Sequence, residues 1–546
     1  MTSNRYQTGR DRFENALVRS MSRRRLVAGT GALAALSVTA SLPGRASTVL
    51  GQGTPEGKPV VAITFNGTPF TLGVASGDPL PDGVVLWTRL APTPTGGVGM
   101  PPVPVEVRWE LASDDRFGQI IQSGSAIASP TLAHSVHVDV TGLDPATEYF
   151  YRFMVGSEGS PTGRTLTAPA NDAPVESVRF VHTSCSNYEH GFFSGYRGIA
   201  DDLPDFVLHL GDYIYEYPSE SGYVPSTYDP VRMHVGEETT SLTGYRNRHA
   251  QYKTDPDLQA AHAAAPWMVT WDDHEVENNY AAAVSEDANP ADTFLERRAA
   301  AYQAYYEHMP LRPSSIPTGP DMQLYRSFRY GSLLDVAILD GRQYRSDQPC
   351  GDTVGVRCPQ ALDPNMTMLG PEQEQWVLAS LDASAATWKS IGQQTMMAQL
   401  NVSADEPTFL LDQWDGYPAA RNRFLQHIDS RSIANTVVLT GDIHSAWIND
   451  LMMDFEDANS AIVATELVCT SITADNPLVE QLQQALLINP HIKFVDGLHG
   501  YTLNTLSADT WTAEMRTVPN VTDETAAVST LTSWVVSAGQ AGASEA

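Results

Sequence analysis

The chain has 546 residues, more than one ordinary hydrophobic core organises, so two or three domains are expected. Its hydrophobic fraction of 42% and its 10 tryptophans are those of a folded globular protein and exclude a chain that is disordered throughout. The formal net charge of -30 argues against a nucleic-acid-binding module with a cationic face and against electrostatic docking on anionic lipid. The ordinary interpretation of this charge is solubility.

The N-terminus has the pattern of an export signal. Arg23, Arg24 and Arg25 precede a short apolar run at 26–40 that is rich in small residues. The paired arginines indicate the twin-arginine route, so the export machinery of that route is an expected partner. The run is shorter than the roughly 20 residues that span a bilayer, which predicts an exported protein (periplasmic, cell-wall or extracellular) rather than an integral membrane protein. We expect signal and flank at 1–48; a basic disordered tail is the alternative.

The segment 66–168 is predicted to be an all-β domain. Short strands at 84–88, 103–111, 135–140 and 147–153 are separated by turn signals, which is typical of a β-sandwich. The run from Leu143 through Pro145 to Tyr149 resembles fibronectin type III domains, of the immunoglobulin-like class. In that resemblance Tyr149 has the structural role of a tyrosine corner.

A Pro- and Ala-rich stretch at 168–176 is expected to be a domain boundary, and the remainder at 176–525 is predicted to be α/β. Apolar runs predict strands at 178–183, 206–210, 267–271, 334–339, 388–393 and 436–440, and helical periodicity predicts helices at 294–308 and 371–383. The last residues, 528–546, are small and polar enough that we expect them to fray.

Side chains capable of binding metal follow four of the predicted strands. They are Cys185; Asp212 and Tyr215; Asp272, Asp273 and His274; and Asp442 with His444. Loop positions held by a rigid sheet are where binding and catalytic groups gather. Each group alone has an ordinary interpretation as a turn residue, a surface charge or a buried aromatic, but their concurrence predicts a multinuclear metal centre.

The ligand types indicate which metals are expected. A phenol with a pKa near about 10 binds as phenolate at neutral pH only to a strong Lewis acid, so Tyr215 favours ferric iron over Zn²⁺ or Mg²⁺. A Cys185 thiolate points the same way, since Ca²⁺ and Mg²⁺ prefer oxygen. The adjacent carboxylates of Asp272 and Asp273 would repel in a dry pocket unless cations neutralise them. Asn278, a few residues on, offers a neutral oxygen.

Positive charge for a phosphate is expected from Arg342 and Arg345, which follow the strand at 334–339. Surface salt bridges are the alternative for either side chain. Of the four cysteines, Cys350 and Cys358 bracket a Gly-containing stretch and are expected to form a local disulfide in an exported protein. Cys469 is expected to be buried as a small apolar side chain.

At this point the chain resembles the alkaline phosphatase D (PhoD) family. The resemblance rests on the segments 73–79 and 85–89, Ser184-Cys185, the stretch 204–216, the stretch 271–279, the stretch 339–345 and the stretch 441–445. It implies a metallophosphoesterase-type catalytic domain with an αββα layered sandwich, a ferric ion and calcium. Carried over by residue, iron is held by Cys185, Asp212, Tyr215 and His444, and calcium by Asp212, Asp272, Asp273, Asn278 and Asp442.

The implied function is an exported metal-dependent phosphoesterase, an alkaline phosphatase and phosphodiesterase that scavenges phosphate from mono- and diesters. The metals and Arg342 would bind the phosphoryl oxygens, and His274 would contact the phosphate or protonate the leaving oxygen. Two alternatives stay open: a phospholipase D-like esterase acting on phospholipid, and a non-catalytic exported binding protein with a structural metal.

Overall fold

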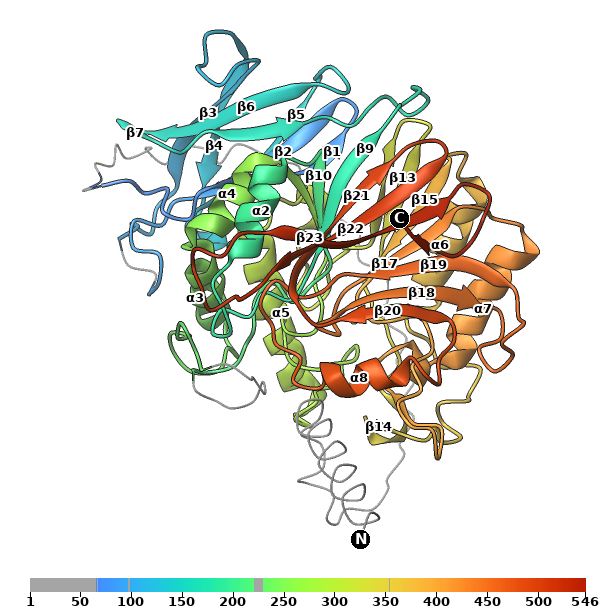
Figure 1. The fold of residues 1–546 in the computed structure, drawn as a ribbon. Helices are drawn as coiled ribbons and strands as arrows, with labels where there is room; N and C mark the ends of the chain where they lie inside the picture. Colours follow the sequence, from blue (N-terminus) through green and yellow to red (C-terminus); the bar gives the residue numbers. More distant parts are fainter. Residues whose placement is uncertain (1–64, 66, 97–98, 220–228, 353) are drawn as a thin grey trace, which may run out of the picture.

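The computed structural model describes residues 65, 67–96, 99–219, 229–352 and 354–546, so the expected export signal lies outside the described residues. Two large sheets form the body of the molecule (Figure 1). The first has the order β24 (Ser544–Glu545), β23 (Ser529–Ser537), β22 (Thr510–Val518), β21 (His499–Leu506), β9 (Val178–Thr183), β10 (Phe206–His209), β11 (Pro266–Val269), β1 (Val74–Leu80), β2 (Gly83–Arg89) and β5 (Ser135–Thr141). Strands β9, β10, β11 and β1 run parallel.

The second sheet has seven strands. Its order is β12 (Arg326–Tyr330), β13 (Leu334–Ile338), β15 (Trp388–Gly392), β17 (Thr436–Thr440), β19 (Ile462–Val468), β18 (Ala446–Met452) and β20 (Ile492–Asp496). Strands β13, β15, β17 and β19 are parallel. The mixed α/β architecture predicted from the sequence is confirmed.

The two sheets pack face to face, and helices cover their outer faces. Successive side chains of a central strand therefore alternate between these two cores. Phe180 of β9 and Leu208 of β10 face the second sheet, whereas their neighbours Val181 and Val207 pack against helices. The helices on that outer face are α2 (Ser194–Asp202), α3 (Leu242–Lys253), α4 (Pro256–Ala264) and α5 (Ala291–His308). Against the second sheet pack α6 (Gly370–Ala383), α7 (Pro418–Ser430) and α8 (Val479–Ala485). The order is therefore helices, sheet, sheet, helices.

The N-terminal β region is joined to the first large sheet. Its remaining strands form a second layer of β4 (Ile120–Ala128), β3 (Val105–Ala112), β6 (Glu148–Val155), β7 (Glu158–Gly159) and β8 (Gly163–Leu166). Val84 and Leu86 pack across to Val107 and Phe153 as in a sandwich. The opposite sheet is shared, because β1 pairs in parallel with β11 and so loses a free edge.

Smaller features of the sequence prediction can also be compared with the structure. The Asp144 N–H donates to the Tyr149 hydroxyl at 3.0 Å, as a tyrosine corner requires. Cys350 and Cys358 form a disulfide, and Cys469 is fully buried. The expectation that the C-terminus frays was wrong, since β23 pairs with β22 and buries Trp534 in the core between the sheets. Among the described helices, none combines the length and apolar character needed to cross a membrane.

Candidate metal and active site

The predicted ligands meet at one edge of the two sheets. Cys185 follows β9, Asp212 follows β10 and Asp273 follows β11, while Asp442 follows β17 of the second sheet. Because the carboxyl ends of parallel strands open at the same edge, loops from both sheets converge there. The sequence motifs were expected to meet because each follows a strand. In the structure they lie together at this edge.

The backbone at this edge is held in unusual conformations. Cys185, Asp212, Asp442 and His444 have positive φ values of 61°, 55°, 64° and 55°. Such left-handed residues other than glycine persist only where the surroundings dictate them, and they cluster at functional sites. Gly211, with φ of 106°, lies so close to the next loop that a Cβ would stand 2.4 Å from the Asp272 nitrogen. The ligand loops therefore pack backbone against backbone.

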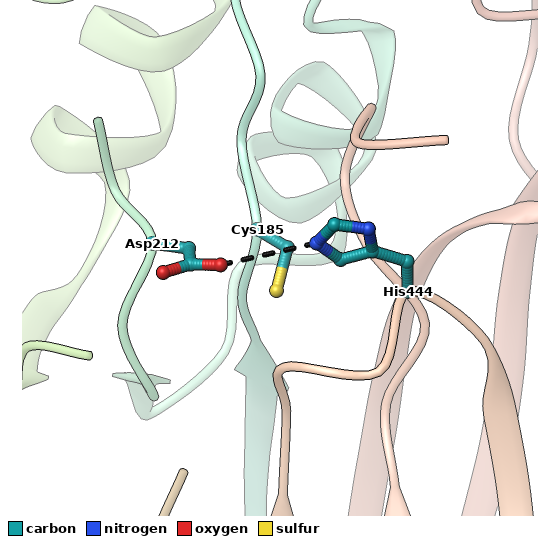
Figure 2. A group of neighbouring side chains, drawn as sticks. All are labelled: Cys185, Asp212 and His444. Atoms are coloured by element: carbon teal, nitrogen blue, oxygen red, sulfur yellow. Dashed lines mark ion pairs between the residues drawn. The ribbon is translucent and has the colours of Figure 1, made fainter. Parts of the chain in front are cut away.

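Cys185, Asp212, Tyr215 and His444 form the first ligand cluster. Donor atoms of Cys185, Asp212 and His444 all lie within 4.8 Å of one another, and Figure 2 shows these three side chains converging from three separate loops. The Tyr215 hydroxyl is 3.0 Å from both Asp212 Oδ2 and His444 Nε2. His444 Nδ1 contacts the Asp475 carbonyl at 3.1 Å, so Nε2 carries the lone pair toward the cluster.

The protonation states of this cluster fit a bound cation. Burial, followed by the Asp212 charge, raises the pKa of the Cys185 thiol and of the Tyr215 phenol well above their usual values. Burial likewise raises the pKa of Asp212, whose Oδ1 is buried without a hydrogen-bond partner. Burial lowers the pKa of His444 to about 3, which keeps this imidazole neutral. Acidic donors that are protonated in a dry site become ligands when a cation displaces their protons.

Asp272, Asp273 and Asp442 form a second cluster of oxygen donors within 4.8 Å of one another. Burial raises the pKa of Asp442 to about 7 and that of Asp272 well above its usual value. Burial acts the same way on Asp273, but Arg342 and His274 lower its pKa to about 2. Asn278 lines one cavity together with Asp273 and Asp442. Its amide nitrogen donates to Glu286 at 2.9 Å, which leaves the amide oxygen for the site. This all-oxygen set suits a hard cation.

Arg342 and Arg345 lie behind the carboxylates rather than on the pocket wall. The Arg342 side chain is fully buried, and its guanidinium contacts four carboxylates: Asp272, Asp412 at 3.0 Å, Asp442 at 3.4 Å and Asp273 at 3.7 Å. Arg345 donates to the Asp412 carbonyl and to the Tyr417 hydroxyl. The structure thus gives both guanidinium groups partners within the protein, a different placement from the direct phosphate contact expected from the sequence.

His274 lines the pocket and is held by a residue whose role the sequence did not reveal. Its Nδ1 lies 2.8 Å from Glu216 Oε2, and the other Glu216 oxygen accepts the Asn278 N–H at 2.9 Å. Burial alone lowers the pKa of His274, but the Glu216, Asp273 and Asp212 carboxylates together raise it well above the usual value. Glu216 directly follows Tyr215 in the sequence, and this adjacency was the one available signal.

Two further carboxylates organise the site. Glu275 accepts backbone N–H groups from Asp212 at 3.0 Å, Tyr213 at 2.5 Å and Asp272 at 2.8 Å, and so joins two ligand loops. Asp412 lines the pocket and contacts Arg342. Glu275 stands within the acidic run, whereas Asp412 follows only the two-residue strand β16 (Phe409–Leu410), too short to predict from sequence.

A cavity of about 110 Å³ opens over both clusters. Its described lining is Asp212, Tyr217, Asp273, His274, Asn278, Asn279, Leu410, Asp412, Asp442, Ile443, His444, Asp475, Asn476, Pro477, Leu478 and Leu482. Cys185, Tyr215 and Asp272 are buried and are not part of this lining. The site can therefore hold cations on its floor and admit a small substrate from above.

Comparisons with known proteins show the family of this chain. The family model described as PhoD-like phosphatase matches residues 180–515, and its N-terminal domain model matches residues 57–169. Alkaline phosphatase D of Bacillus subtilis (strain 168) is 47% identical over 528 residues, covering 96% of this chain and 89% of that protein. A solved structure described as "Structure of PhoD" is 49% identical, covers 89% of this chain and 93% of its own, and superimposes with a TM-score of 0.87. The chain belongs to the PhoD-like phosphatase family and is a hydrolase of the phosphatase class.

Proposed function

We propose that the protein is an exported, metal-dependent phosphoesterase that hydrolyses phosphate mono- and diesters. The observation that supports this most directly is that two buried donor clusters share one cavity, whose lining includes Asp212, Asp273, Asp442 and His444. Charge that develops on phosphoryl oxygens needs cations nearby, and this floor has the donors to hold them. The export signal at 1–48, the sandwich domain at 66–168 and the metallophosphoesterase-type αββα domain at 176–525 belong to the same proposal.

For the metals, we propose ferric iron in the first cluster and calcium in the second. Cys185 and Tyr215 are soft or phenolic donors that distinguish the first cluster from the second, whose donors are all oxygen. Possible ligand atoms of Asp212 also lie within 4.8 Å of those of Asp273 and His274, so Asp212 would be able to serve the cations of both clusters. When bound, the cations supply positive charge to the phosphoryl oxygens and acidify the attacking water.

The chain's own residues then position the substrate and move the proton. Glu216 engages His274 Nδ1, which leaves Nε2 as the nitrogen available to a substrate in the cavity that His274 lines. We assign His274 the proton for the departing alcohol oxygen, as the phosphorus–oxygen bond to that alcohol breaks and water forms the new one. Arg342 acts indirectly, because its contacts hold Asp272, Asp273 and Asp442 in place.

The test is metal analysis of the folded protein together with hydrolysis of 4-nitrophenyl phosphate, bis(4-nitrophenyl) phosphate and phosphatidylcholine. Iron and calcium with turnover of the first two substrates support the proposal. Release of phosphatidic acid from phosphatidylcholine in preference to both would favour the phospholipase alternative. A fully metal-loaded protein that hydrolyses none of the three would leave only a structural role for the centre.

The ligand assignment is tested separately. Cys185→Ser and Tyr215→Phe should each lower iron content, and Tyr215→Phe should also remove any visible colour from phenolate-to-iron charge transfer. Cys469→Ser and Tyr213→Phe are matched controls, because both side chains are buried and neither belongs to a donor cluster. Unchanged iron in Cys185→Ser or Tyr215→Phe would remove that residue from the ligand set.

A further inference from the structure

The cavity lining combines two kinds of residue. Most of it is polar, with the acidic, amide and imidazole side chains of the metal clusters and, beside them, Asp475 and Asn476. The rest is aliphatic: Leu410, Ile443, Pro477, Leu478 and Leu482. We call these five residues the apolar wall. The polar residues account for binding a phosphoryl group, but they do not account for an aliphatic surface in the same cavity.

The apolar wall is an extension of a rigid core. Leu410, Ile443, Leu478 and Leu482 belong to the same hydrophobic cluster as the helices packed on the second sheet. The strand β16 that carries Leu410 pairs with β14 (Val354–Gly355). These side chains are therefore fixed before any substrate arrives.

Hydrogen bonds tie the apolar wall to the ligand loops. The Asn476 side chain donates to the Ile443 carbonyl at 2.9 Å and accepts the Leu478 N–H at 3.0 Å. Ile443 itself stands between Asp442 and His444, so the wall begins at the metal donors. An organic group attached to a phosphorus atom held at the floor would extend along this surface.

We propose that the apolar wall selects phosphate esters of apolar alcohols, with Leu410, Leu478 and Leu482 as specificity-determining residues. The proposal rests on the phosphoesterase function above. An alkyl or aryl group gains by leaving water for this surface. A hydroxylated group of similar size, such as glycerol, loses hydrogen bonds to water and finds no donor or acceptor among these five side chains. The neighbouring Asn476 amide is already engaged by the Ile443 carbonyl and the Leu478 N–H.

The test uses the metal-loaded enzyme with methyl, butyl and hexyl phosphate and with glycerol phosphate, following phosphate release. These alcohols are similar leaving groups, so kcat/KM reports mainly on the organic group. We expect a rise of about fourfold for each methylene that becomes buried, and a butyl ester preferred over the glycerol ester by roughly tenfold or more. Binding of hexylphosphonate against methylphosphonate, measured by calorimetry, gives the same comparison without turnover.

Variants locate the preference on the wall. Leu482→Asn and Leu478→Asn should flatten the chain-length dependence and lose most of the hexylphosphonate advantage, while Leu482→Met, which keeps volume and apolar character, should retain it. Leu487→Asn is the matched control, since Leu487 is 88% exposed just beyond α8 and lies outside the cavity lining. Thermal unfolding of each variant shows whether it is folded.

The outcomes separate the two proposals. Equal kcat/KM and equal phosphonate affinity across the series would overturn the role of the apolar wall while leaving the phosphoesterase intact. The same would follow if Leu482→Asn and Leu478→Asn kept the full chain-length dependence. Absence of hydrolysis of every ester would instead overturn the phosphoesterase function, and the phosphonate comparison would then decide the wall by itself.

Discussion

Arg342 offers the sharpest test of how this site is held together. Its guanidinium is fully buried and contacts four carboxylates, three of them at 3.0 to 3.7 Å. With an effective dielectric constant of about 20, each of those three contacts represents roughly 4–6 kcal/mol of gross attraction, most of it offset by desolvation. Deleting one partner of a buried ion pair costs about 3–5 kcal/mol because the other charges stay buried.

We therefore expect Arg342→Met to lower the free energy of urea unfolding by about 3–5 kcal/mol in EDTA at pH 8, followed by tryptophan fluorescence. Added calcium should recover much of this loss, since a cation restores a partner to the carboxylates and binds only the folded chain. The cost should shrink at pH 5. The pKa of Asp442 is about 7 even with Arg342 present, so below that pH the carboxylates relieve repulsion by taking up protons.

Arg329→Met is the control, because Arg329 makes a two-point ion pair with Asp335 that is partly exposed, with side-chain exposures of 32% and 19%. Such a pair is worth about 0–1 kcal/mol. A loss below about 1 kcal/mol for Arg342→Met in EDTA, or no recovery with calcium, would refute the role of Arg342 as the counter-charge of the carboxylates.

Three further predictions concern the frame around the site. His182 is buried in β9 with its pKa lowered by burial to about 3, against about 6.5 when unfolded, so its contribution is constant above about pH 6.5 and falls toward pH 3. Between pH 8 and pH 5 the free energy of urea unfolding should therefore fall by about 2 kcal/mol less in His182→Met than in the wild type. An identical decrease in both proteins would contradict this reasoning. Glu275→Gln should lower the free energy of unfolding by about 1–3 kcal/mol and reduce metal content, because its amide NH₂ would face backbone N–H donors. Unchanged metal content and stability would show that other contacts hold the loops. Cys358→Ser opens the loop closed by the disulfide with Cys350 and should lower the free energy of unfolding by about 2–3 kcal/mol, measured from the urea midpoint. Dithiothreitol should shift the wild-type midpoint by the same amount and leave that of the variant unchanged.

Local sequence patterns were sufficient to predict many of the strands. Residues 178–183 and 436–440 were predicted as strands and form β9 and β17 with those bounds. Their short apolar runs suit strands buried on both faces. The meeting of Cys185 with His444 also followed from the sequence, because both were expected after strands of one α/β fold.

Other features depended on pairings between distant segments. β1 pairs with β11, and β23 pairs with β22. The residues of these strands do not by themselves specify which strand lies alongside. Arg342 was correctly placed after a strand, but whether its guanidinium faces a substrate or a nest of carboxylates depends on loops from β11 and β17.

By itself, the sequence determined which side chains this protein has for chemistry and at which strand ends they stand, because hydrophobic period and residue type are local properties. Only the tertiary structure decided which of those side chains line the cavity and which hold other side chains or loops in position. Glu216 behind His274, Glu275 across two loops, and Arg342 beneath the acidic cluster all act over contacts of 4 Å or less between residues far apart in the chain. Such contacts exist only once both sheets have packed and water has left the space between the loops.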